Sequence, residues 1–206
     1  MGKRLREMWR GIRFYYWIAL AILLTGIFVG AFLPHIIEEV VLAMIAEVEK
    51  IAENITKNDN VFTTIRIIFQ NNVMAAIMML GMGVFFGFFP IIGLYSNGAV
   101  LGYLLTNPPK NSTLSSWEIL GYGILPHGIF EFAAVLLASG MGIKLGVLVF
   151  RSIGALFVAE RRAKVKKDWE GTFRIMFTTV LATVVLLLVA AIIESTVTPY
   201  LLQAMK

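Results

Sequence analysis

The chain has 206 residues, of which 58% are hydrophobic and only 15% are charged, and its mean hydropathy is +0.80. Soluble domains carry about 25% charged residues, so this composition excludes an ordinary soluble enzyme and a disordered protein. It also excludes a nucleic-acid-binding protein, although the net charge is +5. The absence of cysteine excludes disulfides, thiolate nucleophiles and cysteine-ligated metals.

Several apolar segments are long enough to cross a membrane as helices, which takes about 20 residues each. The long uncharged stretch Ile67–Thr106 has room for two spans, and Pro90 predicts an interruption around Gly87–Gly93. We therefore predict an all-α, polytopic membrane helical bundle with about five transmembrane helices, forming a single domain over residues 1–206. The predicted spans are 14–34, 63–87, 90–106, 119–139 and 173–194.

Basic residues predict the orientation, because short loops rich in Lys and Arg remain in the cytoplasm. Residues 3–13 and 161–167 hold 10 of the 18 basic residues. Both segments are cytoplasmic if four spans lie between them, which places the N-terminus inside and the C-terminus outside the cell membrane. Six spans, with the opposite placement of the C-terminus, is the main alternative.

Residues 142–160 fit this count less well. They are apolar enough to insert, yet the parity of the crossings leaves them no independent span. Lys144 and Arg151 are seven residues apart and so lie near one helical face. We expect either an interfacial or re-entrant helix on the cytoplasmic side, or a long continuation of the fourth span.

Segment 36–57, between the first two spans, is predicted to be an amphipathic helix outside the cell. It is acidic, and its apolar residues follow a heptad pattern. The stripe consists of Ile37, Val41, Met44, Val48, Ile51 and Ile55. It either lies on the membrane and the protein's own outer loops, or forms a contact with a partner or a second subunit.

Four glycine pairs have the small-xxx-small spacing that lets membrane helices approach closely. They are Gly26–Gly30, Gly83–Gly87, Gly98–Gly102 and Gly142–Gly146. Most are expected to serve internal packing, and at most one or two to mark a subunit interface. Besides the lipid bilayer, we expect a second copy in a dimer, or other membrane proteins, as partners.

Polar groups at membrane depth are costly and are therefore candidates for function. His127 and Glu131 are four residues apart and share a helical face. Pro126 and Gly128 predict a helix break beside them. The pair either holds this break through a hydrogen bond, or forms an ion, proton or partner site.

Asn71, Asn72 and Asn97 complete the predicted intramembrane polar site, because the amides of the first two can pair with backbone groups freed at the break. Glu194, at the end of the last span, is placed at the membrane interface and given no role. No phosphate-binding loop and no catalytic constellation is found in the sequence. We expect no enzyme activity, no metal site and no cofactor.

Three stretches resemble the stage II sporulation protein M family. They are Asn71-Asn72-Val73-Met74-Ala75, Asn97-Gly98 and Pro126-His127-Gly128-Ile129-Phe130-Glu131, and the last is the most specific. The resemblance covers nearly the whole chain and implies a polytopic membrane protein, often assigned five spans. It also implies an anchoring role beside peptidoglycan-hydrolysing partners in sporulating bacteria, although the family extends to organisms that never sporulate. It implies no catalytic residues.

These observations support two functional hypotheses above a third. The first is a non-enzymatic scaffold, or assembly component, of a membrane complex, with the outside helix as its contact surface. The second is a small channel or transporter in which His127 and Glu131 line an ion or proton path. An intramembrane enzyme is the third and weakest.

Overall fold

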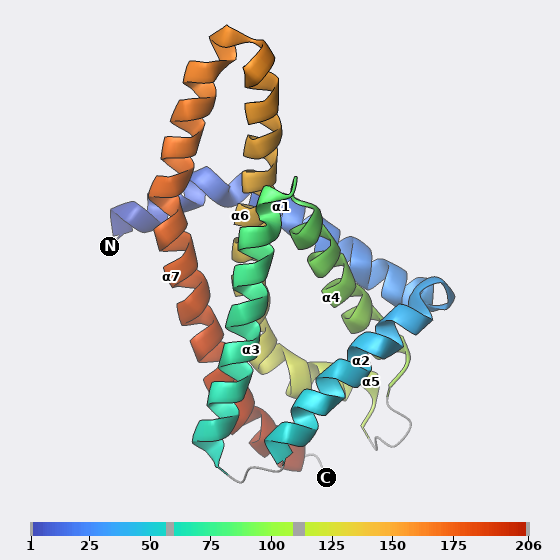
Figure 1. Ribbon diagram of the computed structural model, residues 1–206. Helices are drawn as coiled ribbons and strands as arrows, with labels where there is room; N and C mark the ends of the chain where they lie inside the picture. The colour runs from blue at the N-terminus through green and yellow to red at the C-terminus, as the bar shows by residue number, and fades with distance from the viewer. Residues whose placement is uncertain (1, 57–59, 109–113, 205–206) are drawn as a thin grey trace.

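The computed structural model describes residues 2–56, 60–108 and 114–204, and within this part of the chain the regular structure is entirely helical (Figure 1). Two short irregular helices, the 3-10 turn η1 and the π-helical turn η2, interrupt the α-helices. In chain order the elements are α1 Gly2–Phe32, α2 Pro34–Thr56, α3 Val61–Gly81, η1 Met82–Val84, α4 Phe88–Thr106, α5 Ser116–Glu118, η2 Ile119–Ile124, α6 Leu125–Phe157 and α7 Ala159–Ala204.

Five helical segments among the described residues are long and apolar enough to cross a membrane. They are Gly2–Phe32, Val61–Val84, Phe88–Thr106, Ser116–Phe157 and Ala159–Ala204. The predicted all-α membrane fold is confirmed. Several helices are longer than the predicted spans, because hydropathy detects only the apolar part of a helix and not its charged extensions.

Helix α6 forms the centre of the bundle and contacts α1, α3, α4 and α7. In its most apolar stretch 67% of the residues are buried, against 33% or fewer in each of the other four spans. Small residues on α6 explain this position, since Ala134, Ala138, Ser139 and Gly142 let neighbouring backbones approach closely.

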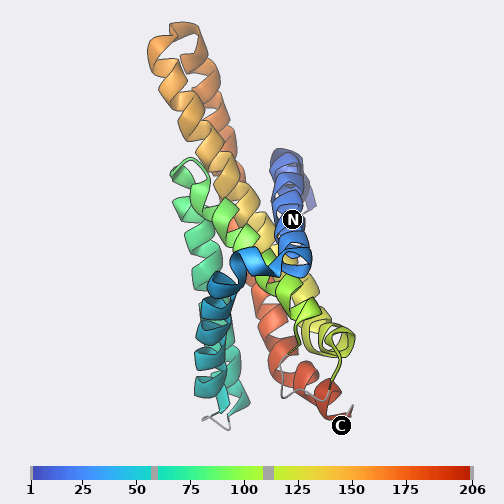
Figure 2. The ribbon, with the colours of Figure 1, turned by 90° about the vertical axis from the view of Figure 1, so that its right-hand side faces the viewer.

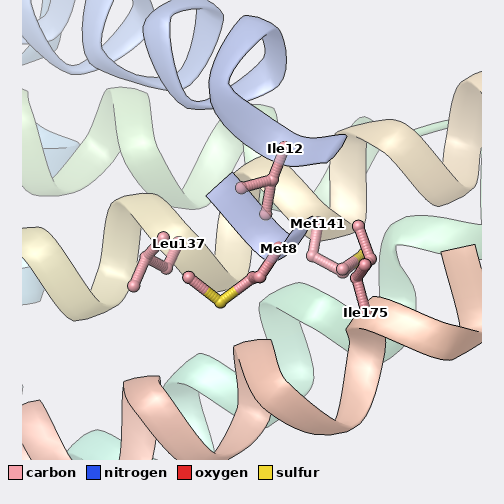
Figure 3. Packing of buried hydrophobic residues seen from close by; sticks show 5 residues of the cluster. All are labelled: Met8, Ile12, Leu137, Met141 and Ile175. Carbon is pink, nitrogen blue, oxygen red and sulfur yellow. The ribbon is translucent and has the colours of Figure 1, made fainter. Parts of the chain in front are cut away.

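The core at the basic end of the bundle joins three helices (Figure 3). Met8 and Ile12 of α1 pack against Leu137 and Met141 of α6, and Ile175 of α7 closes the cluster. The start of α1 is thereby fixed across α6 and α7. This contact places the basic N-terminal residues beside the other two helices.

Two of the glycine pairs join α1 to α4. A Cβ atom on Gly26 would overlap the carbonyl oxygen of Tyr95, and one on Gly98 would overlap that of Leu23. Gly30 and Gly102 are equally crowded one turn further along. The two small-xxx-small pairs therefore pack on each other within one chain, as most of them were predicted to do.

The other two pairs bring the α3–α4 turn onto α6. A Cβ on Gly83 would overlap the backbone of Gly142, and one on Gly146 would overlap the backbone nitrogen of Gly87. Gly87 has φ +77°, a left-handed conformation that favours glycine. All four pairs thus serve contacts within this chain, and the chain turns before Pro90, which lies in the first turn of α4.

Residues 142–157 continue α6 without interruption. The separate interfacial or re-entrant helix expected over 142–160 is therefore not formed, and the alternative of a long continuation describes the structure. Helices α6 and α7 form a hairpin that projects beyond the ends of α1, α3 and α4 (Figure 2). Arg151 and Asp168 form an ion pair across it, with Nη1 and Oδ2 3.4 Å apart. This pairing gives Arg151 a partner on α7 and so stabilises the continued helix.

Helix α2 occupies the range predicted for the helix between the first two spans. Its stripe faces the chain itself in the first two turns, where Val41 is 1% exposed and α2 contacts α4. Ile37 and Met44 are half-buried on the same side. Val48, Ile51 and Ile55 lie outside the residues whose side chains are described. The first half of the stripe, Ile37, Val41 and Met44, therefore belongs to the chain's own packing.

Candidate functional site

A cluster of three ionisable side chains lies between α6 and α7. His127 and Glu131 come from the first two turns of α6, and Glu194 comes from α7. One ligand atom of each residue lies within 4.8 Å of the other two. His127 Nε2 is 4.0 Å from Glu194 Oε2, and the His127 side chain is only 12% exposed. The predicted pairing of His127 with Glu131 is thus part of a larger cluster.

Irregular backbone precedes the cluster on the α6 side. The segment Ile119–Ile124 is π-helical, and regular α-helix begins at Leu125 with Pro126 in its first turn. Proline is tolerated at this point because the first backbone N–H groups of a helix have no partner within the helix. The predicted break therefore lies just before Pro126, whereas Gly128 is buried within regular helix.

The α7 side of the cluster adds a second contact to the histidine. Thr198 is buried one turn after Glu194, and its Oγ1 lies 3.3 Å from His127 Nδ1. Both ring nitrogens of His127 therefore face groups on α7. Such a contact fixes the orientation of the imidazole ring, which decides what its other nitrogen can bind.

The cluster combines one imidazole and two carboxyl groups at the edge of a buried helix. Two carboxylates so close repel each other unless a proton or a cation lies between them. One nitrogen and two oxygen donors also form a ligand set that divalent transition metals accept. The arrangement can therefore hold a cation, or pass a proton between α6 and α7.

The three asparagines of the predicted site do not join this cluster. Asn97 is exposed and donates from Nδ2 to the carbonyl oxygen of Gly93 in its own helix, 2.9 Å away. Asn71 is exposed and Asn72 is half-buried on α3, and within the described part of the chain neither amide forms a hydrogen bond. The prediction that these asparagines share a site with His127 is therefore wrong.

Glu194 and Thr198 are the cluster residues that sequence reasoning missed. Glu194 is the only acidic residue between Gly171 and the end of the chain. An isolated acid at the end of an apolar helix is a signal that we assigned to the membrane interface, although it also fits a buried pair. Thr198 carries no comparable signal, because threonine often bonds to the carbonyl of its own helix.

Comparison with known proteins agrees with the resemblance noted in the sequence. A protein of Methanocaldococcus jannaschii, described as uncharacterized, is 30% identical over 139 residues, which cover 64% of this chain and 69% of that protein. No solved structure matches the chain. The model of the family described as stage II sporulation protein M matches residues 17–199. Because this match includes all five candidate spans at least in part, the chain is a multi-pass membrane protein that belongs to the stage II sporulation protein M family.

Proposed function

We propose that this protein is a non-enzymatic assembly component of a membrane complex and that it binds a partner at the tip of the α6–α7 hairpin. The observation that carries the proposal is the exposure of large apolar side chains there. Phe157 is 83% exposed, Phe150 71% and Leu156 68%. Contiguous apolar surface in water is the usual mark of a protein contact.

The lengths of the helices support placing this tip outside the bilayer. Helix α7 has 46 residues, which corresponds to about 70 Å, whereas the hydrocarbon core of a membrane is about 30 Å thick. The Arg151–Asp168 ion pair and the bond from Trp169 Nε1 to Ser152 Oγ provide a polar level at the foot of the tip. On this placement Leu156 and Phe157 lie beyond the polar level and face water.

Charge narrows the kind of partner. The apolar tip is continuous with the basic start of α7, which carries Arg161, Arg162, Lys164, Lys166 and Lys167. A partner with an apolar patch bordered by acidic residues would complement both features. This contact surface differs from the α2 stripe predicted from the sequence, the first half of which packs on α4.

The test compares a variant of the hairpin tip with a variant of a phenylalanine elsewhere that is as exposed as Phe157. The double variant Leu156→Ser with Phe157→Asp should reduce the size of the complex extracted from native membranes in mild detergent, measured by native electrophoresis. Phe62, 82% exposed at the start of α3, provides the control variant Phe62→Asp, which should leave the complex unchanged. A complex of native size in the tip variant would contradict the proposal.

A membrane-bound tip is the competing explanation of the same apolar surface. Phe157→Cys carrying a bimane label provides a single fluorescent probe in liposomes that contain this protein alone, because the native chain has no cysteine. Fluorescence unaffected by brominated lipid supports a tip in water that is free to bind protein. Strong quenching by brominated lipid would place the tip in the bilayer and overturn the proposed contact.

Ion or proton transport is a second candidate, favoured by the close approach of His127, Glu131 and Glu194. Intramembrane carboxyl and imidazole groups are typical of proton relays. Purified protein in liposomes should then dissipate a proton gradient followed with a pH-sensitive dye, and His127→Ala combined with Glu131→Gln should stop this flux. Liposomes that hold the gradient with the native protein would count against transport.

A further inference from the structure

Helix α1 crosses α6 and α7 at the foot of the hairpin (Figure 1). Adjoining cavities lie between residues of these three helices. The first, of about 420 Å³, is lined by residues that include Lys144, Arg151 and Lys167. It shares Glu7, Arg174 and Ile175 with a second of about 420 Å³. The two cavities therefore adjoin each other, and together they are lined by residues of α1, α6 and α7.

The two cavities are strongly cationic. The side chains that line the two cavities include the five cations Arg4, Lys144, Arg151, Lys167 and Arg174, against the two carboxylates Glu7 and Asp168. Arg151 is paired with Asp168, and Lys144 donates to the carbonyl oxygen of Gly11 at 3.0 Å. Among the described residues Arg4, Lys167 and Arg174 form no ion pair. Even with Glu7 in both cavities, the excess of positive charge along them favours an anionic ligand.

An apolar groove adjoins the second cavity. The second cavity shares Arg4, Phe177 and Thr178 with a groove of about 750 Å³ between the start of α1 and the middle of α7. Its remaining walls are apolar and include Leu5, Leu181 and Val185, each between 41% and 52% exposed. Its α7 residues belong to the uncharged stretch 175–193, which is the part of α7 suited to the hydrocarbon region.

We propose that the second cavity and the groove beside it together bind one anionic phospholipid. Its phosphate lies between Arg4 and Arg174, and an acyl chain follows Leu181 and Val185. Charge complementarity selects an anionic head group, and basic pockets between membrane helices are suited to such lipids. The apolar groove favours a lipid over a free phosphate, since a soluble anion leaves this surface uncovered.

The experiment titrates the full chain in detergent with dioleoylphosphatidylglycerol and counts bound lipids by native mass spectrometry. One tightly bound anionic lipid is expected, with much weaker binding of dioleoylphosphatidylcholine. Removing two cations with Arg4→Gln and Arg174→Gln should lower the affinity about thirtyfold, at about 1 kcal/mol for each basic residue. Equal binding of both lipids by the native chain would overturn the proposal.

Two controls separate this site from general attraction to positive charge. Lys3→Gln with Lys166→Gln removes the same charge outside the cavities and should leave the bound lipid in place, whereas an equal loss in both double variants would contradict a specific site. Val185→Trp should block the groove and weaken lipid binding, while Leu188→Trp, at a residue of similar exposure outside it, should not. If glycerol 3-phosphate displaces the lipid at equal concentration, the apolar groove contributes nothing and the proposal fails.

Discussion

At the scale of single residues, the contact between His127 and Thr198 distinguishes this site from an ordinary helix contact. Two other hydroxyls on the same stretch of α7 bond to carbonyls of their own helix: Ser195 to Ala191 and Thr196 to Ile192. Thr198 instead faces the imidazole on α6. Burying a polar group costs free energy unless it has a hydrogen-bond partner. The contact with His127 supplies this partner, so the Thr198 hydroxyl links the two helices.

Thr198→Val should therefore lower the thermal stability of the protein in detergent. The substitution removes the hydroxyl beside His127 Nδ1 and costs about 1 kcal/mol, which corresponds to a fall in Tm of about 2–4 °C for a chain of this size. Circular dichroism during heating measures the change. Thr196→Val removes a hydroxyl bound to its own helix and is the control. Equal Tm values for both variants would show that the contact contributes nothing.

At the scale of elements, α1 and α4 are joined by backbone contact along two glycine pairs. Lipid supplies no hydrophobic drive between helices, so their association depends on this close approach. The same pattern on separate chains would make a dimer interface. Here both partners occupy one chain.

Gly26→Ala and Gly102→Ala should each separate α1 from α4. The added methyl group meets a backbone carbonyl that cannot move aside, and such overpacking costs about 1–3 kcal/mol. We expect a lower Tm in detergent for each variant. Gly81→Ala is the matched control, because nothing lies within 4 Å of its Cβ position. A native Tm for Gly26→Ala would contradict the packing described.

The turn between α6 and α7 depends on one arginine. Arg162 Nε and Nη2 donate to the carbonyl oxygens of Ala155 and Leu156, at 3.2 and 3.0 Å. These carbonyls end a helix and lack partners within it, and a basic side chain is a suitable cap. The guanidinium thus holds the tip of the hairpin closed.

Arg162→Ala should expose these carbonyls and loosen the tip. Amide hydrogen exchange of residues 150–165 should become faster, while exchange in the rest of α7 stays at its native rate. Lys166→Ala removes the same charge and carries no such cap, so its exchange should match that of the native protein. Unchanged exchange in Arg162→Ala would mean that the turn holds without this residue.

At the scale of the whole molecule, the start of α1 crosses the foot of the α6–α7 hairpin, whose tip carries the second basic segment, and the last turns of α7 lie at the opposite end (Figure 1). The basic residues predict that both segments face the cytoplasm. In that predicted orientation the proposed lipid site and the hairpin tip lie on the cytoplasmic side, and the His127 cluster lies toward the opposite side.

Cysteine labelling tests this orientation directly, because the native chain has no cysteine. Single variants Lys50→Cys, Asn111→Cys, Lys166→Cys and Gln203→Cys should report outside, outside, inside and outside. A membrane-impermeant maleimide applied to intact cells provides the measurement, and permeabilised cells provide the control. Labelling of Lys166→Cys in intact cells would reverse the proposed topology.

The sequence by itself determined that the chain is a membrane protein, that it is helical, and about how many of its helices are long enough to span the membrane. Hydropathy is a sum over neighbouring residues, so it identifies helices such as α3 and α4 without knowledge of their partners. The spacing of glycines likewise predicted which helix faces pack closely. The single helix over 142–157 was left between two alternatives, because hydropathy does not distinguish an inserted helix from one paired through Arg151 and Asp168.

Only the tertiary structure decided which polar groups meet. The i, i+4 spacing of His127 and Glu131 is local and could be predicted. The approach of Glu194 depends instead on how the C-terminal part of α7 packs against the start of α6. Asn71 and Asn97 lie on α3 and α4, and their amides do not join this cluster. The cluster of His127, Glu131 and Glu194 and the basic cavities therefore arise from the relative placement of whole helices. No single segment of the sequence encodes this placement.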